Sequence, residues 1–137
     1  MTQVYTDVTI QPVMYSDFGV NMTVHPVKKD LSLLTNDLAV IQSVKNIIQT
    51  NFYERPYQPR IGSGLVGMLF EQFTPQSQMM MESAITKAIN NYEPRANLIA
   101  VNVSCNLDTG SVSAQIIFGM NNKTQPVILN MPLTRAR

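Results

Sequence analysis

The amino-acid sequence predicts an α+β fold: two to three helices packed on one face of a small antiparallel sheet, with an extended N-terminal arm. The main observation is a change of period along the chain. Between residues 36 and 92 apolar side chains recur at helical spacing, whereas from residue 98 onward they alternate with polar ones, as in strands. We therefore expect the C-terminal third to form the sheet and the preceding segment to supply the helices.

Length and composition exclude several classes of function. The chain has 137 residues, of which 45% are hydrophobic and only 14% charged, and its formal net charge is +1. This length suits one domain with a substantial core. Nucleic-acid binding normally needs a basic stripe, and the sequence has no basic cluster beyond Lys28-Lys29 and the final TRAR. No apolar run approaches the roughly 18–20 residues of a membrane span, so we expect neither nucleic acid nor membrane as a partner.

Residues 1–28 are predicted to form an extended arm, and residues 29–137 a single α+β domain. Residues 4–10 alternate with a period of two, as in a strand, and Pro12 and Pro26 exclude a continuous helix. Too few bulky apolar side chains gather in the arm to form a core of its own. We therefore expect it to lie on another surface.

Three segments are predicted to be helical. The first spans residues 36–51, with Asn36 or Thr35 as its cap. A short helix is expected at 65–73, and a longer one starts at the Thr-Pro step of 74–75, where threonine caps and proline takes the first helical position. The methionines of the long helix fit core packing, their usual role, and also an adaptable binding groove. Its expected core face contains Met81, Ile85, Ala88, Ile89 and Tyr92.

Three strands follow, in LIAVNVSC, SVSAQIIFGM and TQPVILNMPL. The tripeptide DTG at 108–110 is typical of a hairpin turn between the first two. In each strand one alternating set of apolar side chains is expected to face the core. These sets are Ile99, Val101, Val103 and Cys105; Val112, Ala114, Ile116 and Phe118; and Val127, Leu129, Met131 and Leu133.

Residues suited to catalysis or metal binding are sparse. The single cysteine, Cys105, excludes an internal disulfide, and its place in an alternating strand indicates a packed thiol. His25 has no second histidine, cysteine pair or carboxylate cluster nearby, so we expect no metal and no cofactor. Glu54 and Glu93 stand beside arginines, which lower a carboxylate pKa, whereas the acid of a glycosidase needs a raised one. We therefore expect no enzyme. The alternative is a peptidoglycan-cleaving glycosidase, which would need two of the four glutamates to meet in space: Glu54, Glu71, Glu82 and Glu93.

The tripeptide Glu93-Pro94-Arg95 stands between the long helix and the first strand of the sheet. Pro94 stops the helix and pushes Glu93 out of the α region of backbone space. Two interpretations fit equally well. The stiff elbow could present a carboxylate and a guanidinium for paired hydrogen bonds to a partner, or Arg95 could close a local ion pair at the helix end.

Two sequence blocks resemble those of a known family in their residues, order and spacing. YEPR followed by LIAVNV matches a Glu-Pro-Arg signature. Upstream, ERPYQPRIGSGLVGMLFEQFTP matches an Arg-Pro-aromatic turn, a Pro-x-x-Gly step, Leu-Phe-Glu and Thr-Pro, and MYSD at 14–17 matches more weakly. The chain thus resembles the small baseplate wedge, or sheath-initiator, family of contractile phage tails and related injection systems. The resemblance covers residues 14–118. It departs at Arg60, where the family often has an acidic residue.

The resemblance implies a structural subunit of the baseplate wedge, located in the virion tail, made in the host cytoplasm and present in several copies. It implies that the elbow docks on the helical core bundle of larger wedge subunits. The implied partners are these wedge subunits, the tail sheath subunit, and tube or hub proteins. Some family members carry a lysozyme label, which the residues of this chain do not support. The residues assigned to docking are Glu93, Pro94, Arg95, Glu54, Arg55 and Pro56.

The third strand is the predicted contact with the sheath. Its family counterpart implies a sheet edge that meets the first sheath ring, and Pro126 and Pro132 bracket a run that is most easily placed at an edge, because proline cannot donate to a ladder. The run carries no charge, although natural edges are usually guarded by charge. Alternatively the prolines end an ordinary interior strand, and the partner strand lies in residues 3–11. The residues of the predicted edge are Val127, Ile128, Leu129, Asn130 and Met131.

Overall fold

The computed structural model describes residues 12–106, 111–120 and 125–133, and contacts divide the chain into two compact units. The first unit ends at Ala39 and the second begins at Val40. The division into an arm of residues 1–28 and a domain of residues 29–137 stays a prediction. Residues 1–11, the predicted turn at 108–110 and the TRAR tail lie outside the described residues.

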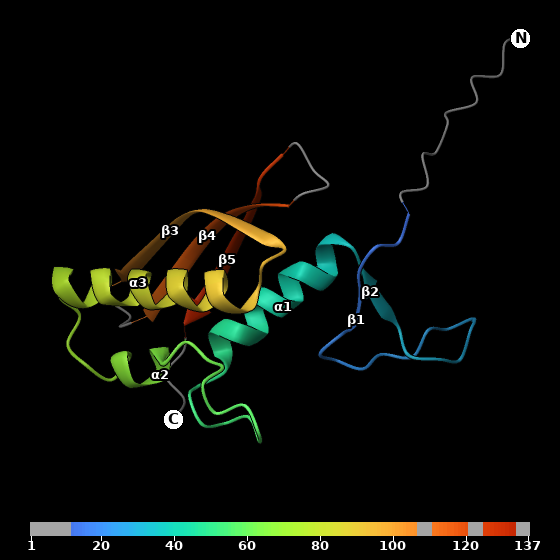
Figure 1. The fold of residues 1–137 in the computed structure, drawn as a ribbon, viewed down its shortest axis with the longest axis horizontal. Coiled ribbons are helices and arrows are strands. Elements are labelled where there is room, and N and C mark those ends of the chain that lie inside the picture. Colours follow the sequence, from blue (N-terminus) through green and yellow to red (C-terminus); the bar gives the residue numbers. More distant parts are fainter. Residues whose placement is uncertain (1–11, 107–110, 121–124, 134–137) are drawn as a thin grey trace, which may run out of the picture. The chain divides into compact units, whose positions relative to one another are not determined.

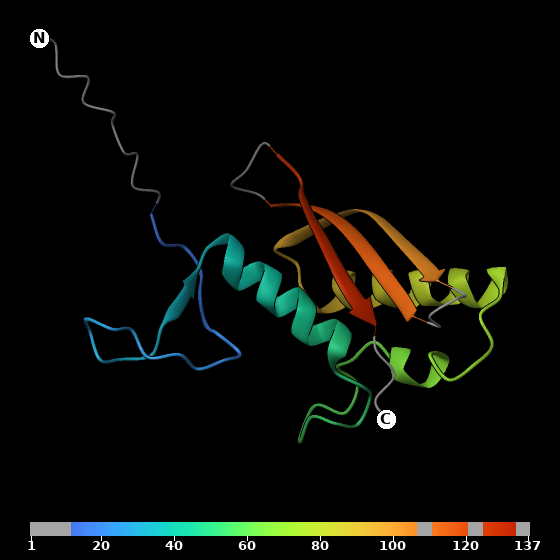
Figure 2. The ribbon, with the colours of Figure 1, turned by 180° about the vertical axis from the view of Figure 1, so that it is seen from behind.

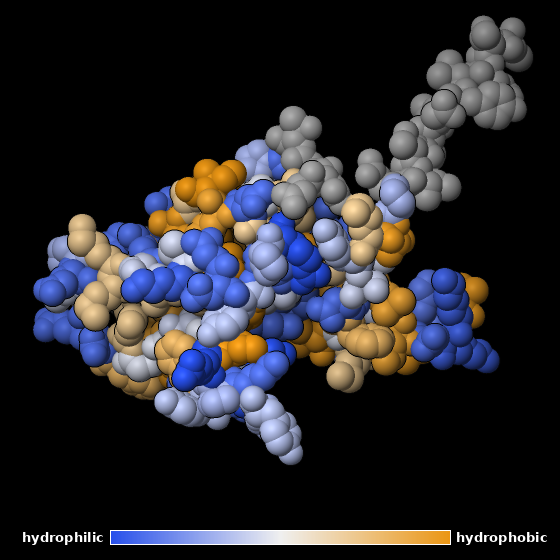
Figure 3. All heavy atoms as spheres, viewed as in Figure 1, coloured by the Kyte–Doolittle hydropathy of each residue, from blue (hydrophilic) through white to orange (hydrophobic). Residues whose placement is uncertain are grey.

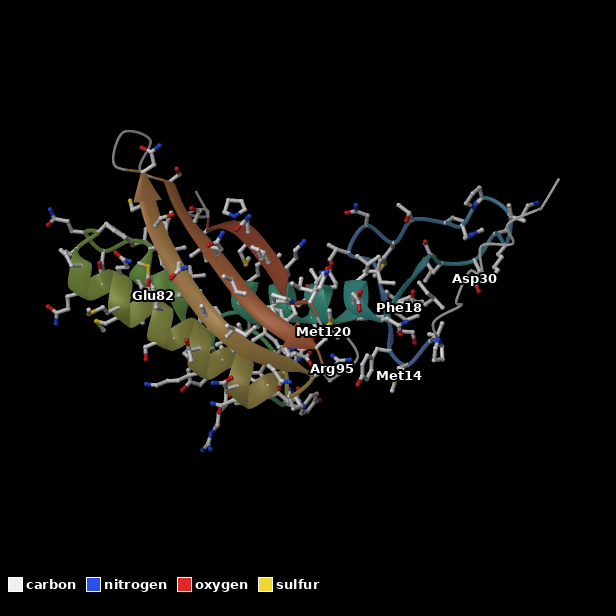
Figure 4. The ribbon with its side chains drawn as sticks, turned by 90° about the horizontal axis from the view of Figure 1, so that it is seen from above. Met14, Phe18, Asp30, Glu82, Arg95 and Met120 are labelled. Carbon is white, nitrogen blue, oxygen red and sulfur yellow. The ribbon has the colours of Figure 1, made fainter. Side chains whose placement is uncertain are left out.

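The first unit contains a β-hairpin. Strands β1 (Ser16–Phe18) and β2 (Leu33–Thr35) pair antiparallel, and a bridge between Val24 and Leu31 extends the pairing. Part of the predicted extended arm is therefore paired with residues that follow it in the chain. Large apolar side chains are exposed on this unit, including Met14 and Phe18, which Figure 4 labels. A two-stranded ribbon of this kind is marginally stable by itself.

Asn36 stabilises this hairpin and does not cap the helix that follows, α1 (Asp37–Gln49). Its Oδ1 accepts hydrogen bonds from the N–H groups of Met14 at 2.8 Å and Tyr15 at 3.4 Å, and its Nδ2 donates to the Pro12 carbonyl at 3.2 Å. Its φ of 49° lies in the left-handed region, which asparagine tolerates better than most residues. The prediction that Asn36 caps the helix is wrong, because its amide is used within the first unit.

The second unit is built on a three-stranded antiparallel sheet in the order β3-β4-β5. These strands are β3 (Ala96–Asn106), β4 (Ser111–Met120) and β5 (Val127–Leu133). The predicted alternation is confirmed on β4 and β5, and Phe118 and Ile116 are fully buried. On β3 it fails at Ile99, which is 63% exposed. A β-bulge between Leu98 and Ala100 inserts one residue into the strand and shifts its alternation.

The helices of the second unit lie on one side of this sheet, as Figures 1 and 2 show for α3 (Pro75–Tyr92) and for α1 from Val40 onward. The predicted cap of α3 is confirmed. The Thr74 hydroxyl accepts from the Ser77 N–H at 3.1 Å, and the Ser77 hydroxyl accepts from the Thr74 N–H at 2.7 Å. The predicted core face is confirmed at its four buried residues, Met81, Ile85, Ala88 and Ile89.

The short helix α2 (Leu65–Met68) covers only the first half of the predicted segment 65–73, and turns follow it at Phe70 and Glu71. Together these elements confirm the predicted α+β class, with the helices on one face of an antiparallel sheet. Within the described ranges, no helix combines the length and the hydropathy needed to cross a bilayer.

Candidate functional site

The predicted docking elbow joins α3 to β3. Glu93 ends the helix in a non-helical conformation, and its N–H still donates to the Ile89 carbonyl at 2.8 Å. The Ala96 N–H donates to the Glu93 carbonyl at 3.1 Å, which closes the turn around Pro94. The proline itself is exposed. The elbow is therefore stiff for two reasons, the ring of Pro94 and backbone hydrogen bonds on either side of it.

Glu93 and Arg95 form a bidentate ion pair across the elbow. Arg95 Nε donates to Glu93 Oε1 at 2.5 Å, and its second guanidinium nitrogen, Nη2, donates to Oε2 at 2.6 Å. The Glu93 side chain is only 2% exposed, whereas that of Arg95 is 35% exposed. Such paired, charge-assisted hydrogen bonds are among the strongest side-chain contacts. Figure 4 places Arg95 near Met120, whose neighbour across the sheet is Ala96.

Two opposing effects act on the Glu93 carboxylate. Burial by itself raises the pKa of Glu93, but hydrogen bonds from Arg95 and Ser43, together with the charge of Arg95, outweigh burial and hold the pKa below its usual value. Ser43 lies on α1, so the carboxylate ties the elbow to that helix as well as to Arg95. Glu93 is therefore ionised and internal.

For Glu93, this geometry favours the local ion pair over a carboxylate that is presented to a partner. The expectation that Glu93 projects from the elbow is wrong, because its carboxylate is buried and fully engaged within the fold. The local ion pair exists. What the elbow presents on its outer side is the exposed ring of Pro94 and the outer third of the Arg95 side chain.

The other predicted docking residues lie on an exposed loop between α1 and α2. Glu54, Arg55 and Pro56 are all exposed. The loop is closed by its own hydrogen bonds, from the Tyr53 N–H to the Pro59 carbonyl at 2.9 Å and from the Asn51 N–H to Glu54 Oε2 at 2.8 Å. Figure 1 shows it extending beyond the end of α1.

Two tyrosines on this loop, Tyr53 and Tyr57, adopt φ values of 68° and 66°. Both side chains are exposed, although aromatic rings are usually buried or half-buried. Bulky residues seldom occupy this left-handed region, and such strain is concentrated at binding and active sites. The loop therefore combines two exposed aromatic rings with backbone strain at the same two positions.

The Pro-x-x-Gly step that follows the loop has a steric reason. A Cβ on Gly62 would lie 2.7 Å from the Asn51 carbonyl carbon, so only glycine allows these two backbone segments to approach. Next to it, the buried Ser63 donates from its hydroxyl to the Ile48 carbonyl at 2.7 Å. The glycine and serine thus fasten the loop to the end of α1.

One hydrogen bond joins the two sequence blocks in space. The Tyr92 hydroxyl, directly before the elbow, donates to the Arg60 carbonyl at 2.6 Å. The loop and the elbow therefore belong to the same side of the second unit. Arg60 takes part in this contact through its backbone carbonyl, so the contact does not depend on the identity of its side chain.

A side chain of α3 bonds one outward backbone group on the outer edge of β3. Glu82 Oε1 accepts a hydrogen bond from the Val103 N–H at 3.0 Å, and also one from the Gln78 amide at 3.1 Å. In Figure 4, Glu82 lies between α3 and β3. A charged side chain on an edge strand is a common protection against the addition of another strand. The only sequence signal for this role is indirect, because Glu82 borders the core face of α3 between Met81 and Ile85.

This contact also fixes the direction of the backbone groups on β5. Because the Val103 N–H points to Glu82, its partner Ala114 directs its own N–H and C=O to the other neighbour, Met131 on β5. Directions alternate along a strand, so Ile128, Asn130 and Pro132 direct their backbone groups away from β4.

Pro132 occupies a position where a missing N–H costs the β4–β5 ladder nothing. It was expected to bracket the edge run, and β5 includes it and continues to Leu133, the last residue of the predicted core-facing set. A proline inside a strand is typical of an edge. Among the described residues, β4 is the only strand that pairs with β5, so the predicted edge run lies at an end of the sheet. Ile128 on this strand is 58% exposed.

The other residues considered for catalysis or metal binding have structural or solvent-exposed positions. His25 Nδ1 accepts from the N–H groups of Val27 and Lys28, both at 3.3 Å, and so supports a turn. Cys105 is a half-buried free thiol. Glu54 and Glu71 are exposed. No group of three or more potential metal ligands occurs within the described parts of the chain.

The sequence matches the model of a protein family, described as baseplate wedge protein gp25, over residues 35–123. The chain belongs to this family. It is also 34% identical to the baseplate wedge protein gp25 of Enterobacteria phage T4 over 107 residues, which cover 78% of this chain and 80% of the phage T4 protein. Both the loop and the elbow lie within the matched residues.

Solved structures share the fold of this gp25 family member at lower identity. A Geobacter sulfurreducens protein provisionally named a tail lysozyme is 21% identical, with a TM-score of 0.65 over 72% of this chain and 89% of its own. A chain of the anti-feeding prophage baseplate is 19% identical, with a TM-score of 0.62 over 86% and 83%. A chain of the post-contracted pyocin R2 baseplate is 18% identical, with a TM-score of 0.53 over 83% and 98%.

Proposed function

We propose that this gp25 family member is a structural subunit of the baseplate wedge of a contractile tail, and that β5 anchors the first tail sheath subunits by strand addition. Family membership and the 34% identity to the phage T4 wedge protein support the wedge role. The observation that carries the sheath role is the difference between the two sheet edges. Glu82 occupies the β3 edge, whereas the outward N–H and C=O groups of β5 face away from the sheet.

The outward groups of β5 make a short, well-defined template. Ile128 and Asn130 each offer a donor and an acceptor, and Pro132 adds an acceptor without a donor. Strand addition uses main-chain hydrogen bonds for affinity and side-chain pockets for register. The prolines at 126 and 132 would limit the donors to two adjacent outward positions, which restricts the register in which a sheath strand can pair.

Docking on the helical core bundle of larger wedge subunits is the second part of the proposal. Its surface consists of the loop residues Glu54, Arg55 and Pro56 and of the outer side of the elbow, Pro94 and Arg95. Glu93 serves this surface indirectly, since its buried carboxylate fixes the orientation of Arg95. A guanidinium that is already oriented loses less conformational entropy when it meets a partner carboxylate.

The alternative function, cleavage of the cell wall by a glycosidase, has less support. The protein provisionally named a tail lysozyme is 21% identical, which is evidence of a shared fold. A glycosidase acid needs a raised pKa, and the pKa of the buried Glu93 is lowered. The Glu82 carboxylate is engaged by a backbone N–H of β3.

Proline and lysine substitutions at Ile128 test the sheath role. Ile128→Pro removes one outward donor, and Ile128→Lys keeps the backbone and adds a charge that opposes strand addition. Both variants should enter the baseplate and yield tails whose tubes lack sheath in electron micrographs. Leu129→Pro is the matched control, because its N–H faces β4 and its loss should destabilise the isolated protein. Normal sheath polymerisation on both Ile128 variants would refute the assignment of β5.

A further inference from the structure

A groove of about 720 Å³ lies along α3, on a different surface from the β5 edge. Its residues on α3 recur at helical spacing for four turns and end near the elbow. These residues are Gln76, Met79, Met80, Ser83, Ala84, Lys87, Ala88, Asn91 and Tyr92. At about 1.5 Å per residue, the stripe is about 22 Å long. Its opposite wall includes Phe52, Gly64, Gly67 and Met68. In Figure 3 many of the atoms between α3 and α2 are tan or orange, the apolar end of the scale.

The groove has the composition of a binding surface. Met79 is 71% exposed and Met80 is 51% exposed, although both are large and apolar. Between these methionines and the elbow, the groove is lined by the small side chains of Ser83 and Ala84. Small side chains leave room for the backbone of another segment to approach α3. Flexible methionines around a groove adapt to the side chains that enter it. The methionine row of the sequence thus serves two roles, since Met81 alone is in the core.

The backbone of the walls indicates what kind of segment fits. The α3 wall is helical, so its N–H and C=O groups are already bonded within the helix and cannot form a ladder with an added strand. A segment that enters an apolar groove must satisfy its own backbone groups. A helix does this, and apolar side chains at i, i+3, i+4 and i+7 then enter the groove.

The charge of the groove indicates which charge the bound segment should carry. Lys87 is the one charged residue among those that line it. No salt bridge to Lys87 occurs within the described residues, where the observed pair is Glu93–Arg95. A carboxylate on the occupant would therefore complete the site. A second copy of α3 supplies none, because its own stripe carries the same lysine and no acid.

We propose that this groove binds an amphipathic helix from a different subunit, with an Asp or Glu beside its apolar stripe that pairs with Lys87. None of the predicted docking residues lines the site, although Phe52 and Tyr92 of its lining adjoin the loop and the elbow, and it lies apart from the sheath contact at β5. It adds a second kind of recognition to the molecule, helix-in-groove on α3 beside strand addition on β5.

A substitution at Gly67 can block the groove without a clash in the fold. A Cβ added to Gly67 meets no atom within 4 Å, and the residue lies in α2 without a positive φ. Gly67→Leu should therefore leave the fold intact and fill the groove with a side chain. The matched control is Asn90→Leu, an exposed position of α3 outside the groove.

The first experiment uses the isolated protein and two synthetic helical peptides of about 16 residues, long enough to match the stripe. They share one apolar stripe and differ only in a Glu or a Lys beside it. Fluorescence anisotropy should show tighter binding of the Glu peptide, at least about tenfold weaker binding to Gly67→Leu, and unchanged binding to Asn90→Leu. In Lys87→Glu the preference between the two peptides should reverse. Absence of binding, equal binding to Gly67→Leu, or no reversal would each refute the proposal.

The second experiment uses assembled tails and therefore rests on the proposed function. A photoreactive phenylalanine analogue at position 67 should crosslink to one helical segment of another subunit that contains an acidic residue. A crosslink to a second copy of this chain, or to a strand, would refute the proposal. If this chain is absent from the tails, the proposed function fails, and the peptide experiment still decides whether the groove binds a helix.

Discussion

At the scale of single residues, Glu93 shows what a sequence can and cannot reveal. The order acid-proline-base predicts a stiff elbow that projects two charged side chains. The structure has a stiff elbow, but of the two charged side chains only Arg95 is partly exposed. The acid is buried, and one of its hydrogen-bond partners is Ser43, fifty positions earlier on α1. No local pattern encodes such a contact. The loop glycine is the opposite case, because Gly62 in the Pro-x-x-Gly step marks a close backbone approach that the structure contains.

Replacement of Arg95 tests the ion pair. Removal of an exposed arginine usually changes stability by less than about 0.5 kcal/mol. Here Arg95→Ala leaves the buried Glu93 carboxylate without its main partner, a change that typically costs about 3–5 kcal/mol. Because Arg95 is partly exposed, we expect the lower end, about 3 kcal/mol. Urea denaturation measures it, and Arg55→Ala on the exposed loop is the control. A loss no larger than that of Arg55→Ala would contradict the structural role of the pair.

The same pair predicts a pH dependence of stability. The pKa of Glu93 is lowered in the folded state from an ordinary value of 4.5, so the unfolded state binds more protons between the two values. The stabilisation is therefore complete above about pH 4.5 and is lost as the pH falls through the folded pKa. The difference in unfolding free energy between the parent and Glu93→Gln should shrink over this acidic range. A difference that stays constant from neutral to acidic pH would rule out the pair as its source.

At the scale of elements, the alternation of apolar residues and the capping rules were sufficient to predict the helices and strands where the chain is regular. The capping residue of α3 and the buried faces of β4 and β5 follow from local rules. Prediction failed where one residue interrupts the period, as at the bulge beside Ile99, or where a side chain is used by a distant segment, as at Asn36. Pro132 lies inside β5, as the predicted alternation through Leu133 requires, but a sequence does not show which way its neighbours' N–H groups point.

Glu82 is the element-scale test, because its carboxylate accepts a hydrogen bond from an outward N–H of the β3 edge. Glu82→Ala leaves the Val103 N–H without its acceptor and should destabilise the second unit by about 1–3 kcal/mol, the cost of a buried unsatisfied donor. It should also open a second edge and promote self-association, which light scattering detects. Glu82→Gln retains an acceptor oxygen and should lose less stability. The exposed Glu71→Ala serves as the control, and an equal effect of the two alanine variants would contradict the role of Glu82.

At the scale of the whole molecule, three surfaces of the second unit have different recognition chemistry. The loop and elbow present charges, proline and tyrosines, the groove on α3 presents methionines and one lysine, and β5 presents backbone groups that are directed away from β4. The first unit carries many exposed apolar side chains of its own. Such surfaces are typical of a chain that functions by assembly with partners.

The purified protein should therefore show no cell-wall hydrolysis. Turbidity assays on peptidoglycan should give background values for the parent and for Glu54→Gln, Glu71→Gln and Glu93→Gln alike. An activity of the parent that any one of these substitutions abolishes would support the glycosidase alternative.

The most direct test of the central claim is a cryo-EM map of the assembled tail end at a resolution that traces main chain. We expect this chain in the baseplate wedge, with a strand of the first sheath ring paired to the outer side of β5 through Ile128 and Asn130. Glu82 should still occupy the β3 edge in the same map. A sheath strand paired elsewhere on this chain, or a sheath ring that does not contact it, would contradict the account.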